Sequence, residues 1–180
     1  MSIETQSRTA LEEFISLLKE VDERWCSPEW NLNSPQDIVG SHRALMHIVE
    51  AALVGYFEQD ASNPDFRRIV TRGRKLTGDN SDAIYFDAPI SPDHAYVIHG
   101  NMNGAAYFSL TIEQGAEDGR IAKSTCGVIN DTKMEVDSNG NFTVYLGGEE
   151  KPSSWLALPQ GTSRVTTRHY FEHAQPAAMD

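Results

Sequence analysis

The hydrophobic pattern of this 180-residue chain changes its period near Tyr85, and this change restricts the possible folds more than any other feature. Before Tyr85, apolar residues recur every three or four positions, which is the period of an amphipathic helix. After it, apolar and polar residues alternate, as in a β-strand with one buried face. The pattern therefore predicts an α+β fold, with two N-terminal amphipathic helices followed by an antiparallel β unit.

The first helix is predicted to begin at Thr9 and to end at Ser27-Pro28. Thr9 and Glu12 have the spacing of a capping box, in which each side chain satisfies the other residue's backbone N–H group. The residue before a proline avoids the α-helical region, so the helix should stop there. Apolar residues at helical spacing form one stripe, at Leu11, Phe14, Leu18, Val21 and Trp25.

A second helix is predicted to begin after Ser34. Ser34 is a favourable N-cap, Pro35 suits the first helical position, and Asp37 lies at the positive end of the helix. Its apolar face is wider than one partner helix can cover, and comprises Ile38, Leu45, Met46, Val49, Ala52, Leu53, Tyr56 and Phe57. We therefore expect the helical pair, residues 1–62, to pack on the sheet or to form a homo-oligomer.

Residues 63–180 are predicted to form the antiparallel β unit of one globular domain. His94–Gly100 and Ala105–Glu113 flank the turn-rich tetrapeptide Asn101-Met-Asn-Gly104, which predicts a hairpin. On the second of these strands, Phe108, Leu110 and Ile112 share one face, and Tyr107, Ser109 and Thr111 share the other.

A second hairpin is predicted between Lys133–Val136 and Phe142–Leu146. The Asn139-Gly140 pair between them suits a turn that needs positive φ. Trp155–Leu158 and Arg164–Phe171 are predicted to be two more strands. Consecutive short strands with tight turns favour a β-sandwich or a partial barrel over a parallel sheet.

The net charge of −11 argues against binding to nucleic acid or to an anionic membrane, because such surfaces need clustered Lys and Arg. Met1–Thr9 is polar and does not resemble a signal peptide, so a cytoplasmic location is expected. The chain has no glycine-rich dinucleotide fingerprint, no Walker-type loop and no Gly-x-Ser-x-Gly motif. No cofactor and no metal site are predicted.

Cys26 and Cys126 lie far apart in the sequence, and two free buried thiols are favoured over a disulfide. His42 lies on the apolar side of the second helix. There it is expected to be a hydrogen-bonded core histidine.

Polar residues at both ends of the β unit are the candidates for chemistry. Asp79, Asn80 and Asp82 precede Tyr85, and they could bind a hard cation, place a general base or form an Asx-rich turn. Arg168 near the other end would need an anionic partner if it faced the interior, such as Asp79, Asp82 or an anionic ligand. The alternative is a surface arginine on an edge strand.

Several segments, read in order, resemble the bacterial domain-of-unknown-function family 1214, which is often found beside family 1254. The segments are Asp79-Asn-Ser-Asp-Ala-Ile-Tyr85, Tyr96-Val-Ile-His-Gly100, Tyr107-Phe-Ser-Leu-Thr111, Val136-Asp-Ser-Asn-Gly-Asn-Phe142, Trp155-Leu-Ala-Leu-Pro159 and Arg168-His-Tyr-Phe171. Ser81 stands where the family pattern has proline, and His169 where it has glutamine. The resemblance implies a jelly-roll-like β-sandwich and no particular activity.

Three functions follow as expectations. The first is a small-molecule-binding or accessory module. Its ligand-binding residues would be Asn80, Tyr85, Tyr107, Ser109, Thr111 and Tyr170, and the strand face that holds Tyr107, Ser109 and Thr111 would line an inner cavity. The second is a hydrolase or lyase acting on a small organic acid or ester, with Asp79 or Asp82 as base and Arg168 as anion clamp. The third is a structural protein that oligomerises through its N-terminal helices.

Overall fold

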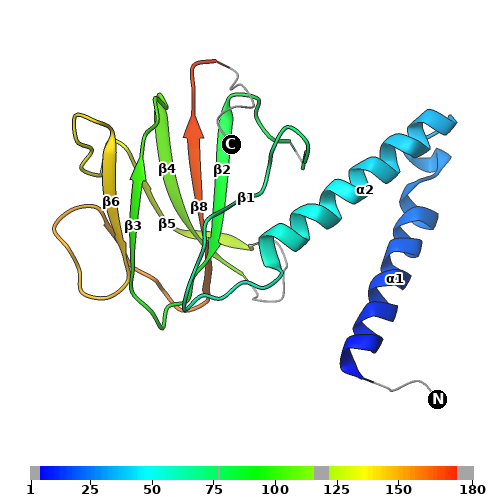
Figure 1. The fold of residues 1–180 in the computed structure, drawn as a ribbon, viewed down its shortest axis with the longest axis horizontal. Helices are drawn as coiled ribbons and strands as arrows, with labels where there is room; N and C mark the ends of the chain where they lie inside the picture. Colours follow the sequence, from blue (N-terminus) through cyan, green and yellow to red (C-terminus); the bar gives the residue numbers. More distant parts are fainter. Residues whose placement is uncertain (1–4, 77, 116–121, 174–180) are drawn as a thin grey trace. The chain divides into compact units, whose positions relative to one another are not determined.

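The structure is a computed structural model of the chain and describes residues 5–76, 78–115 and 122–173. The chain divides into two compact units, residues 1–48 and 49–180, and the long helix α2 runs through the division (Figure 1). The predicted boundary after residue 62, and the packing of the helical pair on the sheet, stay predictions.

The first unit holds α1 (Gln6–Trp25), the short 3-10 helix η1 (Pro28–Trp30) and the first part of α2 (Pro35–Tyr56). The predicted start of α1 is wrong. Its N-cap is Thr5, whose side chain accepts a hydrogen bond from the Arg8 backbone at 3.2 Å. Thr5 offers the same hydroxyl cap one turn earlier than Thr9, so the helix continues through Thr9.

The predicted start of α2 is confirmed. The Asp37 backbone N–H donates to Ser34 Oγ at 3.2 Å, and the Ser34 backbone N–H donates to the Asp37 carboxylate at 2.9 Å. These reciprocal bonds satisfy two backbone donors at the helix end. Within the described chain, neither long helix has the apolar character that crossing a bilayer requires.

The second unit contains two sheets that pack face to face as a β-sandwich, so the predicted α+β fold is confirmed (Figure 1). The larger sheet has the order β1 (Arg67–Arg68), β2 (Ala83–Pro89), β8 (Thr162–Tyr170), β4 (Tyr107–Gln114), β5 (Ser124–Asn130). The smaller sheet has the order β3 (Tyr96–Asn101), β6 (Asn141–Leu146), β7 (Trp155–Leu156), and its β6–β7 pair is parallel.

The hydrophobic core lies between the sheets. Phe108, Leu110 and Ile112 of β4 are fully buried there and meet Val144 and Leu146 of β6 in one cluster. Alternation along β4 therefore places its apolar set inward, as a half-polar strand requires.

The predicted hairpin between residues 94 and 113 is wrong, although both strands exist. β3 pairs with β6 in the smaller sheet, whereas β4 pairs with β8 and β5 in the larger one. The turn after Asn101 carries the chain from one sheet to the other, and the Ala105 backbone N–H donates to Met102 O within it. A turn-rich tetrapeptide is compatible with either connection, so it does not determine strand pairing.

The turn at Asn139-Gly140 is confirmed, since Gly140 has φ 82° and its N–H donates to Asp137 O at 2.9 Å. Before the turn, however, only the isolated bridge Val136–Phe142 forms in place of a full strand. The sequence-based prediction also missed β5 (Ser124–Asn130).

The last turns of α2 belong to the same unit as the sheets and are tied to them by Arg164 of β8. Its guanidinium forms a buried ion pair with Asp87 of β2 and donates to Gly55 O of α2 at 2.9 Å. The Tyr56 ring lies 4.5 Å from the same guanidinium. This network satisfies a buried charge that would otherwise destabilise the fold.

Candidate functional site

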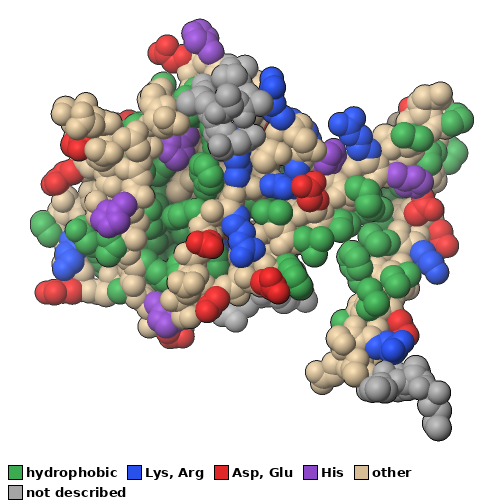
Figure 2. All heavy atoms as spheres, viewed as in Figure 1, with side chains coloured by type: hydrophobic (Ala, Val, Ile, Leu, Met, Phe, Trp, Pro, Cys, Tyr) green, Lys and Arg blue, Asp and Glu red, His purple; other side chains and the backbone are tan. Residues whose placement is uncertain are grey.

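A cavity of about 280 Å³ lies between the sheets, where β2 begins and β8 ends. Apolar side chains are visible in the space between the sheets on this side of the sandwich (Figure 2). The residues that line the cavity are mainly aromatic and aliphatic: Phe66, Ile84, Phe86, Ile98, His99, Gly100, Asn101, Asn103, Phe108, Phe142, Thr167, His169 and Phe171.

His169 is one of the residues that line this cavity, and one of its ring nitrogens has no hydrogen-bond partner among the described residues. Its Nε2 lies 3.2 Å from Asn101 O, and a carbonyl oxygen can only accept, so Nε2 carries the proton. Nδ1 is therefore the acceptor nitrogen, and it is buried without a hydrogen-bond partner among the described residues. Burial lowers the pKa of His169, which favours the neutral ring.

Thr167 lies two residues earlier on the same face of β8, and 5% of its surface is exposed. Its Oγ1 is buried and has no hydrogen-bond partner within the described part of the chain. A buried polar atom without a partner typically costs about 1–3 kcal/mol, so two such atoms in residues that line one cavity are unusual in a stable core.

Aromatic rings set the shape of the cavity. The ring centroids of Phe108 and His169 are 4.7 Å apart, and those of Phe108 and Phe142 are 4.5 Å apart. Phe142 can reach this position because Gly100 opposite it has no side chain. A Cβ at Gly100 would lie 2.3 Å from the Phe142 ring.

Several of the predicted site residues gather on the opposite, outer face of the larger sheet. Tyr85 of β2, Arg168 of β8 and Ser109 of β4 lie in one row across the sheet. The expectation that Tyr107, Ser109 and Thr111 face an inner cavity is wrong, because the apolar residues between them occupy the inner face. Their role in ligand binding stays a prediction.

Tyrosines pack beside Arg168 on this outer face. Tyr170 has its ring centroid 6.5 Å from that of Tyr85 and 5.8 Å from that of Tyr107. Burial raises the pKa of the Tyr85 phenol, and a hydrogen bond with the backbone of Asn80 acts in the opposite direction. The structure therefore brings together the two candidate segments at the start and the end of the predicted β unit, near residues 80 and 170.

The charged residues of the predicted site have separate partners. Arg168 donates to Thr111 Oγ1, and its Nη2 lies 3.6 Å from Glu113 Oε1. The Asp79 carboxylate pairs with Lys75 at 2.8 Å. Asp82 accepts the Phe171 backbone N–H through its carbonyl. Within the described residues, no hydrogen bond or ion pair joins either carboxylate to Arg168, so a catalytic role for these three stays a prediction.

The predicted site residues on β2, β4 and β8 therefore lie on one face of the larger sheet, and the cavity lies on the other face. Ile84 and Phe86 flank Tyr85, and Thr167 and His169 flank Arg168. One signal in the sequence could have revealed the cavity: Thr167 and His169 are polar at alternate positions that otherwise hold Val165 and Phe171.

Comparison with known proteins shows the fold but no family. The chain matches no protein-family model and no curated protein. It is similar to the crystal structure of an uncharacterised protein from Burkholderia cenocepacia, with a TM-score of 0.79 and 22% sequence identity over 93% of this chain. A weaker match, with a TM-score of 0.38 and 18% identity over 99% of this chain, is the VPA0106 protein from Vibrio parahaemolyticus. The chain spans 46% of the Burkholderia protein and 43% of the Vibrio protein.

Proposed function

We propose that this protein is a small-molecule-binding module whose ligand occupies the cavity between the sheets. The ligand would be about one substituted aromatic or aliphatic ring in size and would carry one hydroxyl or similar polar group. The observation that supports this most concerns Thr167 and His169, two of the residues that line this largely apolar cavity. Each carries one buried polar atom, Oγ1 or Nδ1, without a hydrogen-bond partner among the described residues.

The size of the cavity limits the ligand. At about 280 Å³ it is near the lower end of the range of about 300–1,000 Å³ that is typical of ligand pockets. An engineered apolar cavity of about 150 Å³ already binds benzene, so a single ring with a short substituent is a suitable occupant.

The two polar atoms determine how the ligand would be oriented. Neutral His169 accepts a hydrogen bond at Nδ1, and the Thr167 hydroxyl can donate or accept. Rotation of these two side chains toward the cavity would let a ligand hydroxyl donate to His169 and accept from Thr167 while its ring packs against Phe108 and Phe142. Supplying both bonds would remove the desolvation penalty that these atoms carry in the free protein.

Calorimetric titration with p-cresol and toluene tests this proposal, because the two probes differ by one hydroxyl group. We expect p-cresol to bind at least about tenfold more tightly, since one hydrogen bond in a buried site contributes about 1.4 kcal/mol. The Thr167→Val substitution keeps the shape of the side chain and removes its hydroxyl. It should reduce the preference for p-cresol and leave the stability of the free protein equal or higher.

Thr125→Val is the matched control, because Thr125 lies on β5 of the same sheet and is exposed. It should leave the affinities for both probes unchanged. Equal affinities of the wild-type protein for p-cresol and toluene would contradict the proposal. So would a Thr167→Val protein that retains the full preference, or one that loses stability like an ordinary core variant.

We also propose kinship with domain-of-unknown-function family 1214. The ordered segments from Asp79 to Phe171 support it, and the β-sandwich fold agrees with what the resemblance implies. His169, which replaces the glutamine of the family pattern, lies among the residues lining the cavity. Under this proposal, members with glutamine there would present an amide to their ligand in place of a ring nitrogen.

A further inference from the structure

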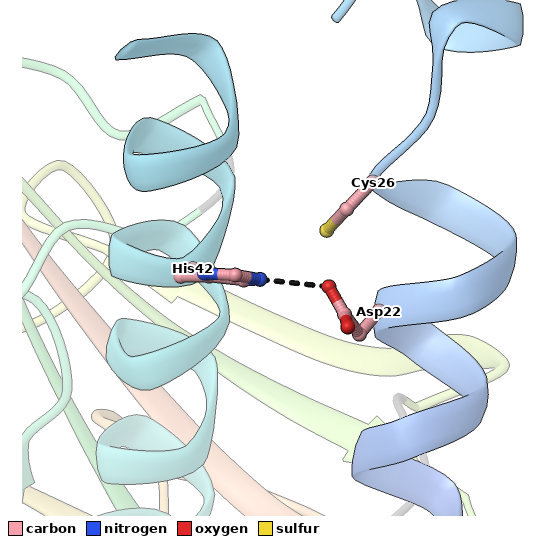
Figure 3. Close-up of side chains that lie close together, drawn as sticks. All are labelled: Asp22, Cys26 and His42. Atoms are coloured by element: carbon pink, nitrogen blue, oxygen red, sulfur yellow. Dashed lines mark hydrogen bonds and ion pairs between the residues drawn. The ribbon is translucent and has the colours of Figure 1, made fainter. Parts of the chain in front are cut away.

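Three side chains with metal-binding atoms meet in the first unit, which holds α1 and the first part of α2. Asp22, Cys26 and His42 each offer one ligand atom, and these atoms lie within 4.8 Å of one another (Figure 3). We propose that they form a site for a divalent transition-metal ion of the Zn²⁺ type. This inference is independent of the proposed small-molecule function.

Helix geometry brings the three ligands together. Asp22 lies in the last turn of α1, and Cys26 is the C-cap residue four positions later, so the two side chains lie on the same side of the helix end. The Cys26 backbone N–H donates to Asp22 O at 3.2 Å and holds this last turn closed. His42 projects from α2 toward them, and its Nε2 lies 2.7 Å from Asp22 Oδ1.

The donor set selects the class of metal. Thiolate sulfur, imidazole nitrogen and carboxylate oxygen are the three ligand types that Zn²⁺ combines in proteins. A tetrahedral Zn²⁺ with bonds of about 2.0–2.3 Å separates its ligand atoms by roughly 3.3–3.8 Å. The three atoms therefore need to move by only about 1 Å, which small side-chain rotations at Asp22 and Cys26 can supply.

Exposure and proton transfer are compatible with this site. About half of the Asp22 and His42 side-chain surface is exposed, so a water molecule can reach the fourth position. Binding would replace the Asp22–His42 hydrogen bond with two metal bonds. The Cys26 thiol would release its proton to solvent, and the imidazole would bind through an unprotonated nitrogen, with no change in oxidation state.

A metal ion that links α1 to α2 would stabilise the first unit, for a structural reason. Among its described residues α1 has no buried side chain, so few apolar contacts hold α1 to α2. Small units with a limited core are commonly stabilised by a metal or a disulfide. A metal that joins α1 to α2 would supply binding free energy to this hairpin.

The test uses the full chain under reducing conditions, with Co²⁺ as a spectroscopic probe and Zn²⁺ as a competitor. We expect one Co²⁺ per chain and a thiolate-to-cobalt absorption band in the near ultraviolet, which Zn²⁺ abolishes. Trp25 precedes Cys26 in the sequence, and its ring centroid lies 4.6 Å from that of Trp30, so this pair should report binding through a change in fluorescence.

Matched substitutions assign the ligands. Cys26→Ser should remove the band, and His42→Gln and Asp22→Asn should each weaken Co²⁺ binding by at least about tenfold. Cys126→Ser changes the other thiol, which lies in the other unit, and His47→Gln changes a second histidine of α2 outside the cluster. Both control proteins should bind as the wild-type protein does.

Three results would overturn the proposal. One is a wild-type protein that shows no thiolate band at millimolar Co²⁺. Another is an equal loss of the band in Cys126→Ser and Cys26→Ser. The third is unchanged Co²⁺ affinity in His42→Gln. Circular dichroism of each variant without metal distinguishes loss of a ligand from loss of the helices.

Discussion

At the scale of single residues, His169 combines two properties that rarely occur together in a core. It packs at 4.7 Å from the Phe108 ring, yet one of its nitrogens has no partner within the described residues. Neutral imidazole tolerates this burial better than the charged ring does, because desolvation penalises the charged form. The same energetic argument connects the candidate binding site to the pH dependence of stability.

We expect the free energy of unfolding to fall as pH decreases from about 7 to about 5. Burial lowers the pKa of His169 in the folded protein, so the unfolded chain takes up this proton first. The contribution is fully present above the unfolded pKa of about 6.5 and decreases below it, by at most about 1.4 kcal/mol per pH unit. Urea unfolding of wild-type protein and His169→Gln at several pH values measures the difference.

Thr125→Val supplies the control for this measurement, because Thr125 is exposed on β5 and has no titratable group, so the variant should retain the wild-type pH dependence. Identical pH profiles for wild-type protein and His169→Gln would show that His169 titrates alike in the folded and unfolded states. The burial argument would then be wrong.

At the scale of elements, the pairing of β3 with β6 shapes the cavity. Gly100 and Phe142 are register partners, and the Phe142 ring occupies the volume that any side chain at position 100 would need. The glycine is therefore required by close packing and not by an unusual backbone angle. Its absence of a side chain lets an aromatic ring from the neighbouring strand form one wall of the cavity.

Gly100→Ala should destabilise the protein by about 1–3 kcal/mol, the usual effect of overpacking a core. In a Phe142→Leu background, the same substitution should have a smaller effect, because the shorter side chain leaves room for the new methyl group. Denaturant unfolding of the four proteins in this cycle measures the coupling. Equal effects of Gly100→Ala in both backgrounds would contradict the predicted collision.

At the scale of the whole molecule, the main hydrophobic cluster belongs to the second unit, and α1 belongs to the first. The main hydrophobic cluster includes only residues of the second unit, from Ala88 to Val165. In α1, large apolar side chains such as Leu11, Phe14 and Leu17 are exposed. The homo-oligomer expected through the N-terminal helices stays a prediction, and these side chains are what it would bury.

A chain that begins at Ser34 should retain the stability of the β-sandwich to within about 1 kcal/mol, because α1 contributes no buried residue. Ser34 is kept so that the N-cap of α2 survives. Near-ultraviolet circular dichroism and cooperative thermal unfolding of the shortened chain test this. Loss of cooperative unfolding would mean that α1 supports the sandwich.

The local order of residues was sufficient to predict the start of α2, the period of the strands and the turn at Gly140. Each depends on contacts between near neighbours in the sequence, such as the Ser34–Asp37 bonds or the positive φ of a glycine. The same reasoning misplaced the start of α1, because Thr5 and Thr9 are both capable caps and the local pattern does not rank them.

Tertiary structure alone decided which strands pair and which face of β8 borders a cavity. The assignment of β3 and β4 to different sheets depends on partners such as β6, far along the chain, and short-range patterns carry no information about them. Arg168 and His169 are adjacent in the sequence, yet one lies on the outer face and the other lines the cavity. Alternation distinguished the two faces of the strand, but only packing against the second sheet determined which face borders the cavity.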